Sequence, residues 1–122
     1  MEFFRIINKQ VTESDLQKNI YPENIEKFAD SMFYIEAKNH DFLGGTIWGE
    51  FLMSYSKING GVRFTLLSCP NAFAWTITTG FPPDKDKIVL HCTINRIQIS
   101  TEFIEEINEF LDEWETGLAN QF

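Results

Sequence analysis

Apolar and polar residues alternate along most of the middle of the chain, which is the pattern of strands with one buried face. The clearest example is residues 73–78, where Phe73, Trp75 and Ile77 share one side and small or polar residues share the other. The same alternation predicts strands at residues 33–38, 46–55, 62–68 and 88–94, and a looser alternation predicts a short strand at residues 2–7. We expect the four strands from residue 46 onward to form an antiparallel meander, because short connections join them.

Turn-forming residues separate these predicted strands. Residues 59–61 (Asn-Gly-Gly) predict a tight hairpin, because asparagine and glycine tolerate the positive φ angles of hairpin turns. Pro70, in the second position of residues 69–72, predicts a β-turn. Two further segments lack periodicity and are predicted to be loops: residues 39–45 and 80–86.

Helical spacing of apolar residues appears toward both ends of the chain. Ser14, with Gln17 three residues later, matches a capping box, and Pro22 suits the first position of a second helix. Ser100 is the predicted N-cap of the last helix, and Gly117 is the predicted left-handed residue at its end. Its apolar stripe is Phe103, Ile104, Ile107, Phe110, Leu111, Trp114 and Leu118.

These elements predict an α+β fold with a mainly antiparallel sheet. We expect the four-strand meander to be joined by the N-terminal strands. The N-terminal helices and the C-terminal amphipathic helix are expected to pack on the sheet. The chain has 122 residues and no linker-like segment, so we predict a single domain over residues 1–122.

Acidic residues outnumber basic ones and are unevenly distributed. The chain carries 18 Asp and Glu against 10 Lys and Arg, for a formal net charge of -8. Residues 101–122 contain seven of these acids and neither Lys nor Arg, so the rest of the chain, with 11 acids and 10 bases, is nearly neutral. The negative charge argues against nucleic acid and anionic membrane surfaces as partners.

The two cysteines and two histidines do not match a metal site or a disulfide scaffold. His91 and Cys92 are adjacent in a predicted strand, so their side chains leave opposite faces. A predicted strand lies between Cys69 and Cys92, which would place them two strand spacings apart, or about 10 Å. This distance exceeds the limit of roughly 7 Å between the Cα atoms of a disulfide. The sequence has no glycine-rich phosphate loop and no serine-nucleophile motif, so we expect no metal and no cofactor.

The apolar runs are much shorter than the roughly 18 residues that a membrane span requires. The first residues include the acidic Glu2 and lack the apolar region of a signal peptide. Two cysteines are too few for a secreted disulfide framework. We therefore expect a cytoplasmic protein without a membrane partner.

The acids of the last helix lie three or four residues apart, where like charges repel by about 0.2–0.5 kcal/mol per pair. Glutamate keeps small proteins soluble, but solubility does not require every charge on one helix to be negative. We therefore predict a non-enzymatic protein that binds a basic protein partner, as an immunity protein, inhibitor or chaperone does. The predicted partner-binding residues are Glu102, Glu105, Glu106, Glu109, Asp112 and Glu113.

The predicted sheet provides an alternative surface. If the strands alternate as expected, one face carries Trp48, Arg63, Thr76, Thr78 and His91. This face suits a small-ligand-binding or enzymatic domain, and it also suits the pairing of two copies in a homodimer. Threonine is favoured in strands for its β propensity alone, so a solvated face fits the same pattern.

Overall fold

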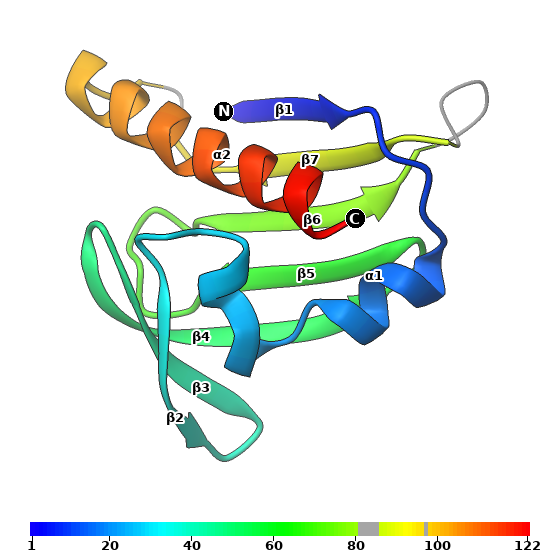
Figure 1. Cartoon of the computed structure of the whole chain (residues 1–122). Coiled ribbons are helices and arrows are strands. Elements are labelled where there is room, and N and C mark those ends of the chain that lie inside the picture. Colours follow the sequence, from blue (N-terminus) through cyan, green and yellow to red (C-terminus); the bar gives the residue numbers. More distant parts are fainter. Residues whose placement is uncertain (81–85, 97) are drawn as a thin grey trace.

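Seven antiparallel strands form one sheet in the computed structural model, which describes residues 1–80, 86–96 and 98–122 (Figure 1). The strands are β1 (Glu2–Ile7), β2 (Phe33–Lys38), β3 (Asp41–Thr46), β4 (Gly49–Ile58), β5 (Gly61–Leu66), β6 (Ala74–Thr79) and β7 (Ile88–Thr93). The helices are α1 (Glu13–Asn19), the 3-10 helix η1 (Pro22–Lys27) and α2 (Thr101–Gln121). The predicted α+β class with a mainly antiparallel sheet is confirmed. Most of the predicted loop at residues 80–86 lies outside the described residues.

The strand order is β1-β7-β6-β5-β4-β3-β2, so β2 to β7 form a continuous meander that is longer than the predicted one. β1 pairs with β7, in a register that runs from Glu2 opposite Thr93 to Ile7 opposite Ile88. After β1, the chain crosses the whole sheet through α1 and η1 before β2 begins at the far edge. The first and last strands of the chain are therefore neighbours.

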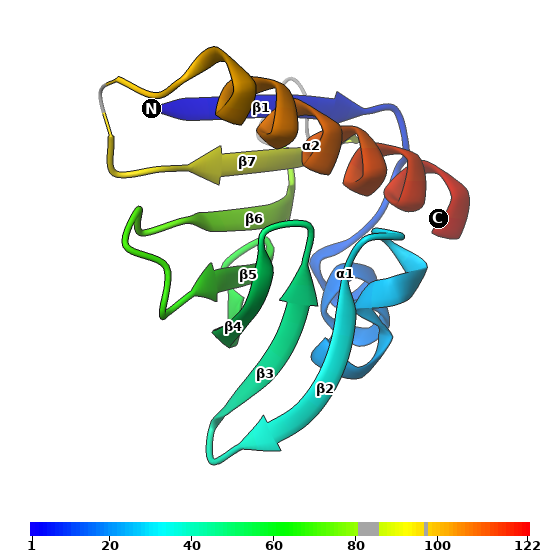
Figure 2. The same cartoon turned by 90° about the vertical axis from the view of Figure 1, so that its left-hand side faces the viewer.

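The helices of the described part of the chain lie on one face of the sheet, and no helix lies over the other face (Figures 1 and 2). α2 contacts β1, and α1 contacts β5 and β6. An aromatic cluster fills the space between the two layers, where the ring centroid of Trp75 lies 5.0 Å from that of Phe110 and 5.3 Å from that of Phe64. We call the uncovered side the open face; its side chains include Phe4, Arg63, Thr76, Thr78 and His91.

α1 begins at Glu13, earlier than the capping pattern at Ser14 predicted. Thr12 is the N-cap, because its hydroxyl accepts a hydrogen bond from the N–H of Asp15 at 3.0 Å. In return, the Asp15 carboxylate accepts from the N–H of Thr12 at 2.9 Å. The hydrogen bond from the Thr12 backbone to the carboxylate, followed by the interaction with the Thr12 side chain, holds the pKa of Asp15 below its usual value.

The second predicted helix is the short 3-10 helix η1. Pro22 begins it as expected, but the backbone leaves the helical region at Asn24, where φ is -120°. The Asn24 side chain accepts a hydrogen bond from the N–H of Tyr21 at 3.0 Å and donates to the carbonyl of Asn19 at 2.7 Å. Asn24 therefore fixes the turn between α1 and η1.

The predicted loop at residues 39–45 is wrong, because most of it forms strand β3. Asn39, with φ of 58°, makes the tight turn from β2 into β3. Gly44 and Gly45 fall in this predicted loop, yet both lie within the strand. A Cβ atom on Gly45 would fall 2.2 Å from the Phe33 ring, so glycine lets this ring lie directly against the strand.

Gly117 does not end the last helix, which continues to Gln121. The residue is buried, and a Cβ atom on it would lie 2.1 Å from the carbonyl oxygen of Phe28. Glycine therefore allows α2 to pack directly against the backbone that follows η1. The prediction mistook a packing glycine for a helix-ending one.

Candidate functional site

Helix α2 is fixed on the sheet by a cap at its start and by apolar side chains along its length. The Ser100 hydroxyl accepts a hydrogen bond from the N–H of Phe103 at 3.1 Å, which confirms the predicted N-cap. The buried residues of the helix are Ile107, Phe110, Leu111, Trp114, Gly117 and Leu118. Because this buried stripe sets the rotation of the helix about its axis, it also decides where each acid points.

Two of the predicted partner-binding acids are half-buried and bonded to other parts of the chain. Glu106 accepts a hydrogen bond from the indole Nε1 of Trp48 at 2.9 Å. Glu113 accepts from the backbone N–H of Ser31 at 2.9 Å and also from the Ser31 hydroxyl. These two carboxylates therefore tie α2 to the connections before β2 and before β4.

The opposite flank of α2 contacts the edge strand β1 through Arg5. The Arg5 guanidinium donates hydrogen bonds to Asn108 Oδ1 at 3.0 Å and to Asp112 Oδ1 at 3.2 Å. Its Nε lies 3.1 Å from Glu115 Oε2. The Asp112 side chain remains 68% exposed, so one cation is shared between two acids and Asp112 is still accessible from solvent.

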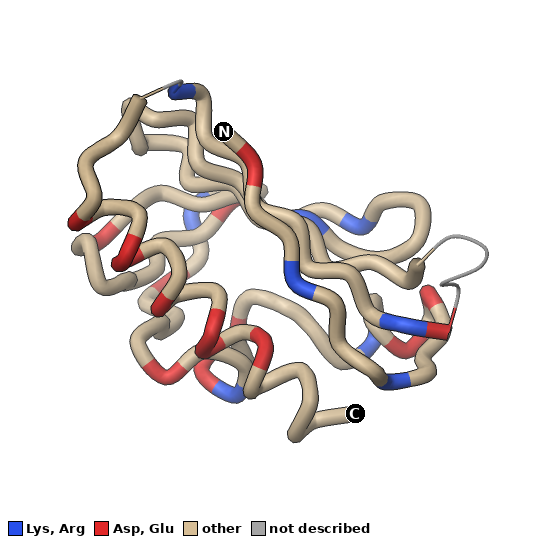
Figure 3. Tube along the Cα trace, turned by 90° about the horizontal axis from the view of Figure 1, so that it is seen from above, with Lys and Arg blue, Asp and Glu red and all other residues tan. Residues whose placement is uncertain are grey.

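The other acids of α2 form a row on its solvent side. Glu102, Glu105 and Glu109 are exposed, and within residues 1–80, 86–96 and 98–122 none of them forms an ion pair or a hydrogen bond through its side chain. Together with Asp112 they make up the acidic row. Figure 3 shows acidic positions repeated along α2. The row presents four carboxylates to solvent over about three helical turns.

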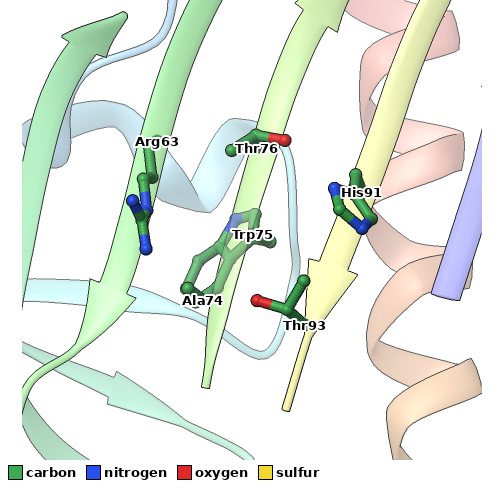
Figure 4. Close-up of a pocket in the computed structure, with 6 residues that line it drawn as sticks. All are labelled: Arg63, Ala74, Trp75, Thr76, His91 and Thr93. Atoms are coloured by element: carbon green, nitrogen blue, oxygen red, sulfur yellow. The ribbon is translucent and has the colours of Figure 1, made fainter. Parts of the chain in front are cut away.

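The open face brings together most of the residues of the alternative site. Arg63 lies opposite Thr76 across β5 and β6, and Thr76 lies opposite His91 across β6 and β7. One hollow of about 240 Å³ is lined by Arg63, Thr76, His91 and neighbouring residues (Figure 4). A second hollow of about 330 Å³ continues toward β1, where Phe4 and Val89 line it.

His91 contacts two residues of β1. Its ring stacks on Phe4 with 4.3 Å between centroids, and its Nε2 lies 3.1 Å from Glu2 Oε1. Arg63 and the threonine hydroxyls supply one cation and several hydrogen-bonding groups beside it (Figure 4). This set can hold a polar or anionic group.

Trp48 does not lie on the open face, where the predicted strand at residues 46–55 would place it. The chain turns between β3 and β4, and the Thr46 hydroxyl accepts from the N–H of Trp48 and donates to the carbonyl of Gly49, both at 3.0 Å. This turn directs the indole to the helix side, against Phe73 and Phe110. The alternative site therefore loses its predicted aromatic anchor.

Both cysteines are free. Cys92 is fully buried, and this burial raises the pKa of its thiol to about 12. The thiol therefore stays protonated at neutral pH, which is the less nucleophilic form. Within the described ranges, no three or more His, Cys, Asp and Glu side chains are grouped closely enough to hold a metal ion.

Sequence reasoning missed the contribution of β1 to both surfaces. Phe4 and Ile6 are 56% and 55% exposed on the side of the strand that continues the open face. Arg5 points to the helix side and meets the acids of α2. The available signal was that residues 2–7 carry apolar residues on both sides of the strand, so apolar side chains were bound to reach the second face as well.

No helix of the described chain combines the length and the apolar character needed to cross a membrane. No family model matches the sequence, and no curated protein matches it. The structure is similar to the crystal structure of an uncharacterised protein from Bacillus thuringiensis, with a TM-score of 0.60 and 10% sequence identity over 95% of this chain and 96% of that one. At this level of identity the similarity shows a shared fold and leaves the functional surfaces to be interpreted from their own chemistry.

Proposed function

We propose that this protein is a non-enzymatic binding protein that holds a basic protein partner against the acidic row of α2. The observation that supports the proposal is that some acids of this helix have partners within the chain and others do not. Glu106, Glu113 and Glu115 have partners within the chain. Glu102 and Glu109, by contrast, are exposed acids without one in the described residues.

The charges of the acidic row are unfavourable in the free protein and become favourable when a basic partner binds. Carboxylates three or four residues apart on a helix repel one another, so the row destabilises the free protein slightly. A basic surface turns the same charges into attraction and speeds diffusional encounter at low ionic strength. Because the carboxylates are exposed, they can meet a partner without rearrangement of the fold.

The test is a capture experiment with two matched variants of the full chain. One variant carries Glu102→Gln, Glu105→Gln and Glu109→Gln, and the other carries Glu26→Gln, Asp30→Asn and Glu50→Gln, three exposed acids outside α2. Both lose three negative charges. Wild type and variants are immobilised, incubated with lysate of the source cell at low salt, and eluted with a salt gradient.

We expect basic proteins that bind wild type and the control variant but not the acidic-row variant, and that elute as salt rises. For a purified partner, neutralising the row should slow association by about tenfold at low salt and flatten its salt dependence. Equal capture by all three proteins would contradict the proposed function, since general charge would then explain the binding.

A second candidate function is the binding of a small anionic ligand on the open face. Arg63, Thr76 and His91 around the 240 Å³ hollow are the observation that favours it. Arg63→Ala with the acidic row intact distinguishes the two candidates. This substitution should abolish ligand-induced thermal stabilisation in a screen of small anions and leave capture of basic proteins unchanged.

A further inference from the structure

We propose that the basic partner docks along the free edge of β1 and adds an extended segment there as a further antiparallel strand. This inference rests on the proposed function, because it takes the partner to be basic. β1 ends the strand order, so its outer edge has no neighbouring strand in the described chain. Figure 3 looks down on this edge and shows β1 uncovered by other described segments.

The backbone groups of β1 that face outward follow from its pairing with β7. Met1 and Ile94 form a hydrogen-bonded pair, in which each N–H donates to the other's carbonyl, at 2.8 Å and 2.9 Å. Hydrogen-bonded and non-bonded pairs alternate along an antiparallel ladder. The N–H and C=O groups of Glu2, Phe4 and Ile6 therefore point away from β7, toward the free edge.

This edge has fewer of the features that normally protect an exposed strand than the opposite edge has. At the opposite edge, β2 has a bulge between Tyr34 and Glu36 and an ion pair between Glu36 and Lys38 at 2.9 Å. β1 keeps six consecutive pairs with β7 without a bulge and contains no proline. Its two charged residues, Glu2 and Arg5, already contact His91 and the acids of α2. Charges, bulges and prolines are the usual devices that prevent pairing at an edge, so β1 remains able to accept a strand.

The two sides of an added strand would meet different chemistry. Residues opposite Phe4 and Ile6 would place their side chains on the open face, beside two apolar groups that are more than half exposed. The alternate residues would point toward α2, where Asp112 contacts Arg5 of β1. Glu105, seven residues before Asp112, lies on the same side of the helix. The partner segment is therefore predicted to alternate apolar and basic residues.

A second copy of this chain fits the edge less well than a basic partner. Each copy carries a formal net charge of -8, and pairing two β1 strands would bring two acidic α2 helices toward each other. The charged residue that a second β1 turns toward the helices is Arg5, which already contacts Asp112 and Glu115 within its own chain. Charge complementarity therefore favours a different protein as the source of the strand.

The experiment uses the full-length protein and a synthetic eight-residue peptide of alternating Lys and Val, capped at both ends. Hydrogen exchange of single backbone amides is followed by NMR. In the free protein the amides of Phe4 and Ile6 should exchange rapidly, and saturating peptide should slow both by about tenfold or more. Failure of the peptide to slow exchange at these two amides would overturn strand addition.

Two N-methylated peptides provide the matched control. In antiparallel pairing the valines share the face of Phe4, so their N–H groups would bond to β1 and those of the lysines would not. Methylating the valine nitrogens should weaken binding by about tenfold or more, and methylating the lysine nitrogens should change it by less than about threefold. Equal effects of the two methylation patterns would overturn the proposed pairing.

The outcomes separate this inference from the proposed function. If the acidic-row variant loses binding while both N-methylated peptides bind like the parent, the row binds basic partners but the edge does not pair. If protection of Phe4 and Ile6 rises with protein concentration in the absence of peptide, the edge pairs with a second copy, and the inference of a basic partner strand is overturned.

Discussion

The flanks and the solvent side of α2 both carry acidic residues, but these acids differ in whether they contact the rest of the molecule. The flanks of the helix use Glu106, Glu113 and Glu115 to contact Trp48, Ser31 and Arg5. The solvent side carries the acidic row, of which only Asp112 has a partner in the described residues. Acidic residues thus stabilise the fold on the flanks of the helix, whereas those of the acidic row remain available for contacts with another molecule.

This difference shows that net charge alone is a poor guide to a binding surface. A helix with seven acids suggests a uniform negative face, whereas packing assigns several of them to internal hydrogen bonds. Only the rotation of the helix, fixed by its buried stripe, distinguishes the two groups. Substitutions that move from the buried side of α2 to its solvent side test the distinction.

The largest effect is expected at Trp114, on the buried side. Its side chain is fully buried and stacks on Phe28, with 5.8 Å between ring centroids. Trp114→Ala should lower the free energy of unfolding by about 3–5 kcal/mol, measured by denaturant titration. Glu109→Ala on the solvent side of the helix is the control, and its free energy of unfolding should stay within about 0.5 kcal/mol of wild type. Similar midpoints for the two variants would show that α2 is not docked.

Gly117→Ala should also destabilise the protein, although alanine normally favours a helix by about 1 kcal/mol over glycine. The added methyl group collides with the carbonyl of Phe28, and such overpacking costs about 1–3 kcal/mol. Thr116→Ala, at the neighbouring exposed position, should be neutral or stabilising. A stabilising Gly117→Ala substitution would contradict the close approach of α2 to Phe28.

On the flank, Glu113→Gln should cost about 1–2 kcal/mol, because it replaces a charged acceptor of two hydrogen bonds by a neutral amide. A double-mutant cycle with Ser31→Ala should show that the two changes are not additive. Additive effects would mean that this contact contributes little to the docking of α2.

The smallest effect is expected at the acidic row, where substitution should raise the free energy of unfolding instead of lowering it. Replacing Glu102, Glu105 and Glu109 with Gln removes like-charge neighbours and should raise the free energy of unfolding by about 0.5–2 kcal/mol at low salt. Loss of the favourable position of Glu102 near the helix N-terminus limits the gain. The increase should fall as salt screens the charges. A decrease at low salt would show that these acids, like Glu113, support the fold.

The parts of the fold that follow from local sequence were predictable. Strict alternation identified β6, and a serine before an apolar stripe identified the start of α2. The failures lie where a residue serves a contact that is distant in sequence. Gly45 makes room for the Phe33 ring and Gly117 makes room for the Phe28 backbone. From sequence alone, each glycine looks like a residue of a loop or of a helix end.

The candidate site was predictable in composition but not in orientation. Spacing places acids on α2, but it cannot show that Trp48 and Ser31 bind two of them. Those bonds depend on the turn before β4 and on the connection before β2, which tertiary packing positions. The role of β1 was missed for a similar reason, because its position at the sheet edge is a property of topology.

The pairing of β1 with β7 has a consequence for the synthesis of the protein. Met1 and Ile94 are 93 positions apart in sequence, so the first strand emerges long before the strand that receives it. At about 5–20 residues per second, roughly 5–20 s pass before β1 can join the sheet. During this time an apolar strand waits unpaired on the ribosome, and closing so long a loop is intrinsically slow. Of the described strands, β1 therefore waits longest for a pairing partner, because every other strand pairs with one that directly precedes or follows it along the chain.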